Sequence, residues 1–403
     1  MPLLITCGSY NFNENTIKCL IENGADFNIK DRKGKTTLSI LYDNGNLNKS
    51  LLYFFYHHGL NIDYESLLFK AHDDKKTNLI EDLIDLFDSK NMTEKEDDDG
   101  NTLLLKACSC KYDKIVQLLL KRKVNVNKKN KEGNTPLIYA CKNGCENIVA
   151  LLIEKGADDN VRNKIGVTPL LIVSKDGNIT VVKHLVENGA DIEKGNNDDN
   201  TPLIYACQHG NENVIKYLVK KGVDINKENT YGKNALFVAC RNDNENIVKL
   251  LIENGTDIGR ANMYGNTPLI CACQYGNEKT IKILVEKGAN INAANIYGKT
   301  PLNYACQNGN ISIVKCLIEK GADINKESKD GETPLMSACA YGKEEIVEYL
   351  LDMGADINKK NIYGRNVLHI SCYERRDNII NILMNKIKNN WYIYIVYYKQ
   401  NLI

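Results

Sequence analysis

A leucine recurs every 33 residues through most of this chain. It occupies nine successive positions: Leu104, Leu137, Leu170, Leu203, Leu236, Leu269, Leu302, Leu335 and Leu368. A fixed period of this length is typical of stacked supersecondary elements, each too small to bury its apolar face without its neighbours. The sequence therefore predicts a repeat array whose core continues from one repeat to the next.

Proline and glycine follow the same period and mark the ends of a short helix. All seven prolines of the chain directly precede a leucine. In the repeat around Pro301, Thr300 can cap the free N–H groups of a helix, and proline at the first helical position loses no hydrogen bond. We expect this helix to run to about Asn308 and to end where Gly309 adopts a left-handed conformation.

A second helix and a reversing loop complete the repeat. Apolar residues at i, i+1, i+3 and i+4, as between Ile148 and Leu152, form a stripe wide enough to pack against neighbouring helices. Gly156 is expected to end this helix. The chain then extends to Gly166, where a tight turn reverses it as a hairpin before the next threonine and proline.

The repeat resembles the ankyrin repeat, on four segments: Thr-Pro-Leu-x-x-Ala, a glycine in the middle, Ile-Val-x-x-Leu-Ile and Gly-Ala-Asp-Ile-Asn. The resemblance implies an all-α repeat solenoid of stacked helix-turn-helix-hairpin repeats. We expect nine regular 33-residue repeats in residues 99–388. Residues 1–98 resemble about three degenerate repeats, because the leucine spacing slips there, and they end in an acidic loop or linker at residues 94–99.

The aromatic tail at residues 389–403 breaks the repeat pattern. Its run from Trp391 to Tyr398 is too short to span a bilayer and is rich in residues that favour strands. Three interpretations stay open. The tail covers the open end of the last repeat, forms a strand that binds a partner, or is an unstructured end.

Charge and hydropathy weigh against two classes of protein. The chain has 52 Lys and Arg against 51 Asp and Glu, whereas nucleic-acid binders usually show a basic excess or a basic face. No apolar run is long enough to span a membrane, and Asn, Glu and Lys interrupt the region that a signal peptide keeps apolar. We expect an intracellular protein of the cytoplasm or nucleus, with no nucleic-acid partner and no transmembrane segment. A local basic strip is compatible with the near balance of charge.

Cysteine is frequent, but its pattern is structural. Of 14 cysteines, nine occupy one repeat position and are expected to fill a small core slot: Cys7, Cys108, Cys141, Cys207, Cys240, Cys273, Cys306, Cys339 and Cys372. Equivalent positions on packed helices lie roughly 8–10 Å apart, beyond the Cα separation of roughly 7 Å that a disulfide allows. We expect reduced thiols, no metal site and no cofactor.

Motifs that suggest catalysis are explained by their place in the repeat. Gly298-Lys299-Thr300 lacks the upstream glycine of a phosphate-binding loop and is predicted to be a hairpin turn. Around Asp97, a calcium loop would place Lys95 and Lys106 at its first and twelfth positions, where neither can ligate the ion. The histidines have no recurring nucleophile or carboxylate partner. We predict no catalytic residues and no enzyme activity.

The surface that the period leaves free carries the functional prediction. In ankyrin-like stacks, the resemblance implies, partners bind the concave face formed by hairpin tips and the exposed side of the first helix. Tyrosine and arginine, which dominate interface hot spots, recur in those slots. The candidate partner-binding residues are Tyr231, Tyr264, Tyr297, Tyr363, Lys233, Lys299, Arg241, Tyr275 and Tyr341. Alternatively, the tyrosines stack on neighbouring hairpins and only stabilise the turns.

The sequence thus predicts a monomeric, non-enzymatic scaffold or adaptor for protein–protein interaction. One alternative is a targeting or regulatory subunit of an enzyme complex, such as a ubiquitin-ligase substrate receptor, for which residues 63–98 and 389–403 would have to supply a docking element. Another is a fragment of a larger ankyrin-containing enzyme, because residues 1–3 begin in the middle of a repeat.

Overall fold

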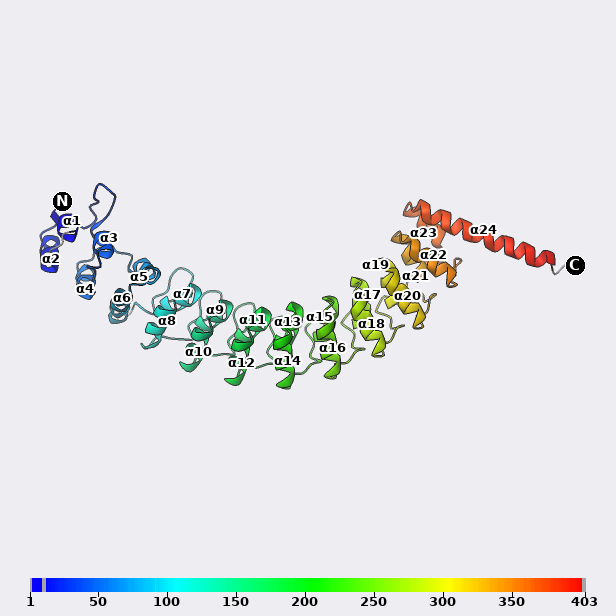
Figure 1. Ribbon diagram of the computed structural model, residues 1–403, viewed down its shortest axis with the longest axis horizontal. Coiled ribbons are helices and arrows are strands. Elements are labelled where there is room, and N and C mark those ends of the chain that lie inside the picture. Colours follow the sequence, from blue (N-terminus) through cyan, green and yellow to red (C-terminus); the bar gives the residue numbers. More distant parts are fainter. Residues whose placement is uncertain (1, 9–11, 91, 401–403) are drawn as a thin grey trace. The chain divides into compact units, whose positions relative to one another are not determined.

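The computed structural model describes residues 2–8, 12–90 and 92–400, with side chains up to residue 388. The described residues form 24 α-helices, which follow one another as pairs of a first and a second helix (Figure 1). This confirms the predicted all-α repeat solenoid. The loops predicted as hairpins form no strands in the described residues, where the one β-bridge joins Lys30 to Thr36.

Three helix pairs precede the regular repeats, and nine pairs follow. The first three pairs are α1 (Pro2–Gly8) and α2 (Glu14–Glu22), α3 (Thr37–Asp43) and α4 (Lys49–His57), and α5 (Tyr64–Asp73) and α6 (Thr77–Ser89). The remaining pairs are α7 (Leu103–Ser109) and α8 (Asp113–Leu120), α9 (Pro136–Lys142) and α10 (Glu146–Glu154), α11 (Pro169–Asp176) and α12 (Ile179–Glu187), α13 (Pro202–His209) and α14 (Glu212–Lys220), α15 (Ala235–Arg241) and α16 (Glu245–Glu253), α17 (Pro268–Tyr275) and α18 (Glu278–Glu286), α19 (Pro301–Asn308) and α20 (Ile311–Glu319), α21 (Pro334–Ala340) and α22 (Glu344–Asp352), and α23 (Val367–Tyr373) and α24 (Asp377–Gln400).

The chain divides into two compact units by its contacts. Unit 1 consists of Met1–Ile172 and His184–Ala190, and unit 2 consists of Val173–Lys183 and Asp191–Ile403. Within unit 2, the first helix α17 packs against α15 and α19, and the second helix α18 packs against α16 and α20. Each layer of helices therefore shares a core with the next repeat. The division predicted from spacing, at residues 98 and 388, stays a prediction.

The periodic leucine is the centre of this core. It is buried at eight of its nine positions, and only Leu368 is partly exposed. Burying one leucine side chain contributes about 1.5–3 kcal/mol. Of the nine cysteines that share one repeat position, eight are buried as expected. The expectation is wrong for Cys372, which is exposed. Its helix, α23, is the last of the first helices and packs mainly against α21 and α24.

Threonine and glycine delimit α17 and α19 as predicted, whereas Asn234 and Asn242 occupy the two cap positions of α15. The Thr267 hydroxyl accepts a hydrogen bond from the backbone N–H of Ile270 at 3.3 Å, which satisfies one of the free donors at the start of α17. The helix α19 ends as predicted at Gly309, which adopts a left-handed conformation with φ +97°. The repeat sequence thus fixes the length of each first helix at about two turns.

An asparagine that was not identified from the sequence organises most of the loops in the regular repeats, and Ser328 takes its place before α21. The Oδ1 of Asn295 accepts hydrogen bonds from the backbone N–H groups of Tyr297 and Lys299, both at 3.0 Å. Its Nδ2 donates to the Oδ1 of Asn266, in the preceding repeat, at 2.8 Å. Equivalent asparagines accept the loop hydrogen bonds in six other repeats: Asn130, Asn163, Asn196, Asn229, Asn262 and Asn361.

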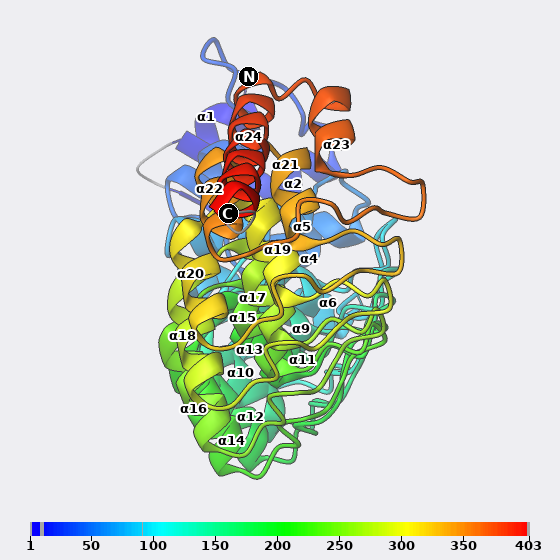
Figure 2. The ribbon, with the colours of Figure 1, turned by 90° about the vertical axis from the view of Figure 1, so that its right-hand side faces the viewer.

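Backbone hydrogen bonds join successive loop tips within unit 2. The N–H of Ile296 donates to the carbonyl of Tyr264 at 3.0 Å, and the N–H of Lys329 donates to that of Tyr297 at 2.9 Å. Gly298 permits this approach, because a Cβ atom there would lie 2.7 Å from the Lys329 nitrogen. The loops follow one another along one edge of the helices (Figure 2). These backbone groups of the tips are therefore already hydrogen-bonded within the protein.

The acidic segment at residues 94–99 forms a loop whose tip resembles those of the regular repeats. The Oδ1 of Asp97 accepts hydrogen bonds from the backbone N–H groups of Asp99 at 2.9 Å and Asn101 at 2.8 Å, as Asn295 does in its own loop. The Lys106 Nζ lies 3.2 Å from the Asp97 carboxylate. Aspartate here takes the place of the loop asparagine.

The C-terminal helix α24 extends into the aromatic tail. Residues 389–400 are helical in their backbone, so the strand interpretation of this segment is wrong. Their side chains and residues 401–403 lie outside the described residues, and the separate tail at 389–403 stays a prediction. Within the part of the chain that the structure describes, none of the helices has the length and apolar character needed to cross a membrane.

Candidate functional site

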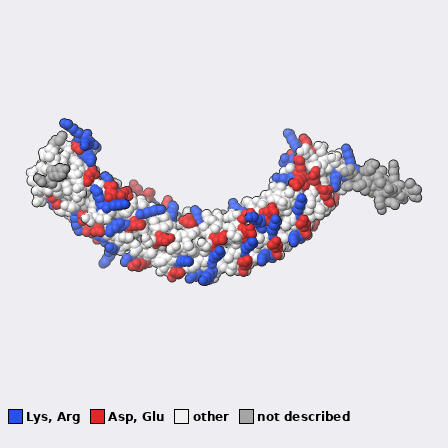
Figure 3. Space-filling view, in the orientation of Figure 1, with Lys and Arg blue, Asp and Glu red and all other residues white. Residues whose placement is uncertain are grey.

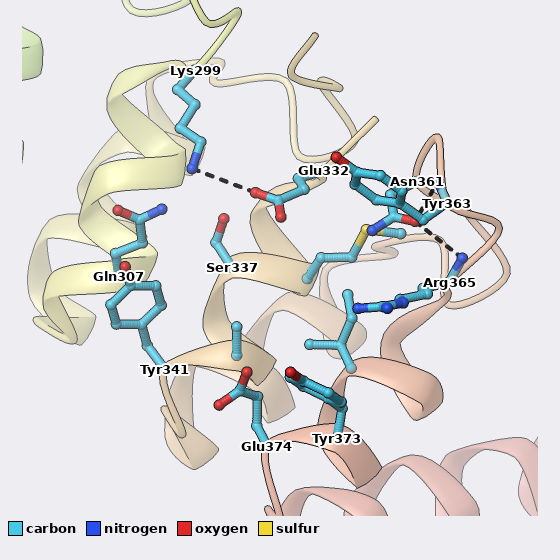
Figure 4. A pocket seen from close by; sticks show the side chains of 13 residues that line it. Lys299, Gln307, Glu332, Ser337, Tyr341, Asn361, Tyr363, Arg365, Tyr373 and Glu374 are labelled. Atoms are coloured by element: carbon cyan, nitrogen blue, oxygen red, sulfur yellow. Dashed lines mark hydrogen bonds and ion pairs between the residues drawn. The ribbon is translucent and has the colours of Figure 1, made fainter. Parts of the chain in front are cut away.

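A concavity in unit 2 collects side chains from both the loop tips and the first helices. It has a volume of about 250 Å³. The labelled residues that line it are Lys299, Gln307, Glu332, Ser337, Tyr341, Asn361, Tyr363, Arg365, Tyr373 and Glu374 (Figure 4). Loop-tip residues and the C-terminal ends of the first helices therefore face one space. We call this surface, together with the same slots in the other repeats of unit 2, the binding face.

The concavity has mixed charge. The Lys299 Nζ lies 3.4 Å from a carboxylate oxygen of Glu332, which partly neutralises both groups. The Arg365 guanidinium lies over two aromatic rings, 5.9 Å from the ring centre of Tyr363 and 5.3 Å from that of Tyr373. Such cation–π contacts hold a guanidinium in place while leaving its charge available.

The candidate tyrosines are all exposed. The exposed fractions are 45% for Tyr231, 42% for Tyr264, 52% for Tyr297 and 70% for Tyr363 among the loop tips, and 48% for Tyr275 and 55% for Tyr341 at the ends of first helices. The aromatic ring pairs found among the described side chains include none of these six tyrosines. These tyrosines therefore do not stack on one another's rings, and their role in binding stays a prediction.

Two of the candidate cations lie on aromatic rings of the same face. The Lys233 Nζ is 5.8 Å from the ring centres of both Tyr231 and Phe237. The Arg241 guanidinium is 5.5 Å from the ring centre of Tyr275. Among the described side chains, the ion pairs of unit 2 include neither cation, whereas Lys299 has one with Glu332. Lys233 and Arg241 are therefore fixed in position without being neutralised.

The structure separates the nine predicted residues into two groups. Lys299, Tyr341 and Tyr363 line the concavity. The other six occupy equivalent slots in earlier repeats: Tyr231, Lys233, Arg241, Tyr264, Tyr275 and Tyr297. Glu332 was not identified from the sequence as part of the face. The available signal was its place in the repeat, because the equivalent slots hold Lys299 in the preceding repeat and Arg365 in the following one.

The thiol beneath the face is a poor nucleophile. Burial raises the pKa of Cys271 to about 12, although the nearby cations Lys233 and Arg241 oppose the shift. A thiol attacks as its thiolate, which burial disfavours here. Among the described side chains, no group of three or more His, Cys, Asp or Glu is placed to hold a metal ion.

Unit 1 contains a cavity of another kind, with a volume of about 320 Å³. Tyr64 lines it, and its hydroxyl is buried without a hydrogen-bond partner. Burial raises the pKa of Tyr64 to about 12. Phe87 and Met92 form apolar walls, and Lys106 closes one side, where its Nζ lies 2.6 Å from Glu65. None of the predicted site residues lies in this cavity.

The charged side chains do not form a large area of one sign on the face drawn in Figure 3, where Lys and Arg alternate with Asp and Glu. A nucleic-acid-binding protein commonly presents a continuous basic patch along which phosphates lie. Figure 3 shows no such continuous patch on the face that it draws.

Comparison with known families identifies the repeats. The family model described as ankyrin repeats (3 copies) matches residues 67–163, 159–229, 222–295, 292–361 and 325–392. Together these matches cover well over half of the chain. A search of curated proteins finds no match to the chain.

Proposed function

Since the chain belongs to the ankyrin repeat family, whose repeats generally mediate protein–protein interaction, we propose that it is a non-enzymatic scaffold or adaptor that holds a partner protein on its binding face. The observation that carries this proposal is the row of exposed tyrosines at the loop tips of unit 2. Three successive tips present Tyr231, Tyr264 and Tyr297, each between 42% and 52% exposed.

Exposed aromatic side chains in a row are unusual unless they are used. A tyrosine offers a large, rigid apolar surface with a polar end, so it loses little conformational entropy when a partner covers it. Residues next to two of the tips add to this surface, since Met263 is 56% exposed and Ile296 is 45% exposed. The tips are held by backbone hydrogen bonds to one another. A partner therefore meets a surface that is already ordered, which favours binding.

We propose further that the protein acts as a monomer in the cytoplasm and binds no nucleic acid. The near balance of charge supports the last point, and the cysteines, which are free thiols in this structure, suit a reducing compartment. A targeting subunit of an enzyme complex would use the same binding face and add a second partner. Light scattering of the purified chain tests the monomer, with a dimer as the contradicting result.

A pull-down experiment with matched variants tests the proposed face. The intact chain is compared with the double variant Tyr264→Ala/Tyr297→Ala and with the control Tyr217→Ala/Tyr349→Ala, whose tyrosines lie on the second helices α14 and α22. We expect a partner that the intact chain and the control recover and the tip variant loses. Equal recovery by all three proteins would show that the partner binds elsewhere.

A further inference from the structure

The charge of the binding face differs between the concavity and the repeats 66 residues earlier in the chain. A shift of 66 residues places Asn266 where Glu332 stands and Asn308 where Glu374 stands. The same shift places Arg241 where Gln307 stands. Both carboxylates of the concavity are thus replaced by neutral amides, and one guanidinium is added. We call this earlier part of the face, from Tyr231 to Asn308, the basic segment.

The cations of the basic segment are available for an anionic ligand. Lys233 and Arg241 lie over aromatic rings and have no ion pair among the described side chains of unit 2. Asp243, in the turn after α15, accepts a hydrogen bond from the Thr280 hydroxyl at 2.8 Å. An exposed cation held against a ring keeps its charge and gives up little entropy on binding a carboxylate.

Acidic residues flank the basic segment on both sides. The loop tip before it carries Asp198 and Asp199, and the tip after it carries Asp330, followed by Glu332. A ligand that matches this arrangement has its negative charge concentrated in the middle and not repeated along its whole length. That description fits a short peptide segment better than a phosphate backbone, whose charge continues past both ends and would meet these carboxylates.

We propose that the basic segment binds a short acidic segment of a partner protein in an extended conformation. The proposal rests on the proposed function and names the chemistry that the partner brings to the same face. Lys233 lies two residues before the start of α15, and Arg241 is the last residue of that helix. The seven residues of α15 rise about 10.5 Å along the helix axis, a span of about three residues of an extended chain. Aromatic or aliphatic residues between the acidic positions would contact Tyr264 and Tyr275.

Selection from a library of random 12-residue peptides displayed on phage tests the proposal with the full chain as bait. Three proteins are compared: the intact chain, the variant Lys233→Gln/Arg241→Gln, and the control Lys249→Gln/Lys282→Gln. The control removes the same charge from the second helices α16 and α18, where each lysine pairs with a glutamate one turn away. Circular dichroism checks that all three proteins melt alike.

We expect the intact chain and the control to enrich peptides with two Asp or Glu residues three or four positions apart. The Lys233→Gln/Arg241→Gln variant should bind the same peptides at least about tenfold more weakly by fluorescence polarisation. Enrichment of neutral or basic peptides would overturn the proposal, as would acidic peptides that the variant binds as tightly as the intact chain does.

Two further arms separate the possible failures. Selected peptides that bind Tyr264→Ala/Tyr297→Ala as tightly as the intact chain would contradict the proposed function itself. Neutral peptides that this variant loses would contradict only the acidic chemistry. A fluorescein-labelled single strand of 20 deoxythymidines is the nucleic-acid probe. Tighter binding of this strand than of the best peptide, lost in Lys233→Gln/Arg241→Gln, would overturn the proposal in favour of a nucleic acid.

Discussion

The loop tips of unit 1 and those of unit 2 share one backbone turn but use their side chains differently. In the tip at residues 94–101, the acidic side chains are engaged within the protein: Glu94 accepts a hydrogen bond from the backbone N–H of Asn125 at 2.7 Å, and Glu96 lies 2.6 Å from the Lys128 Nζ. In unit 2, the tip residues Tyr264 and Tyr297 are exposed. At this tip of unit 1 the acidic side chains join neighbouring repeats, whereas at these two tips of unit 2 the tyrosines face outward.

This contrast shows which parts of the repeat are free to carry function. The buried leucine, the loop asparagine or aspartate and the tip glycine recur in both regions, because they hold the stack together. The tip side chains are not needed for that purpose in unit 2. A residue that contacts the next repeat stabilises the array, whereas an exposed one is available to a partner.

The largest expected effect separates the core from the tips of the same repeat. Leu302→Ala removes a fully buried side chain from α19 and should lower the free energy of unfolding by about 2–5 kcal/mol. Tyr297→Ala, five residues earlier, should change it by less than about 0.5 kcal/mol. Urea unfolding followed by circular dichroism measures both variants. Similar losses for the two would show that the tyrosine is part of the scaffold.

A pair of glycines in one loop tests the contact between tips. Gly298 and Gly288 both have positive φ, but a Cβ at Gly298 would lie 2.7 Å from the Lys329 nitrogen, and one at Gly288 would meet nothing within 4 Å. Alanine at Gly288 should cost about 1–2 kcal/mol for the left-handed conformation alone. Alanine at Gly298 should cost about 1 kcal/mol more. Equal losses in thermal unfolding would show that the tips tolerate separation.

The tyrosines provide the comparison between binding and stability. Each of Tyr264→Ala and Tyr297→Ala should weaken binding of a captured partner by about 1–3 kcal/mol. Titration calorimetry of the purified partner measures the loss. As a control, alanine at a charged tip residue of unit 1, Glu132→Ala, should leave the affinity for the partner unchanged. A loss of affinity at Glu132 equal to that at Tyr297 would place part of the site in unit 1.

The smallest effect concerns the charge at the first regular tip. Burial opposes ionisation of Asp97, but hydrogen bonds from Asn101, Lys106 and the Asp99 backbone outweigh it and lower the pKa to about 2. Its stabilising contribution is therefore complete above the unfolded pKa of about 3.9 and is lost as the pH falls towards 2. Asp97→Asn restores the residue of the other loops and removes only the charge.

The Asp97→Asn protein should remain folded, lose less than about 1 kcal/mol at neutral pH and show a flatter fall in stability between about pH 4 and pH 2. Thermal melts across this range measure the slope. Asp98→Asn, at an exposed neighbouring position, should keep the slope of the unaltered protein. Unfolding of Asp97→Asn at neutral pH would show that the carboxylate is essential to the loop.

The sequence predicts the helices well because their determinants are local and periodic. Pro301, Leu302 and Gly309 define the start, core and end of α19, and the structure agrees with all three. The loop asparagines were missed because an asparagine in a loop is typical of any turn. Only the three-dimensional arrangement shows that Asn295 also reaches the preceding repeat.

The candidate site was less predictable than the fold. Glu332 and Glu374 come from different repeats, and their shared concavity depends on the curvature and packing of the stack. The tip at Asp97 was predicted only as an acidic loop of a degenerate repeat, because aspartate replaces the usual asparagine there and no proline follows in the helix start at Thr102. Residues that depart from the repeat pattern, such as Glu332 and Asp97, were therefore the hardest to interpret from the sequence.

Hydrogen–deuterium exchange of the intact chain, with and without its captured partner, would show which loop tips the partner covers. We expect bound partner to slow exchange in residues 231–308 of unit 2, at the tips and the ends of the first helices, and to leave exchange at the tips at residues 94–101 and 130–134 of unit 1 unchanged. Slower exchange at the unit 1 tips, with none in residues 231–308, would contradict this expectation.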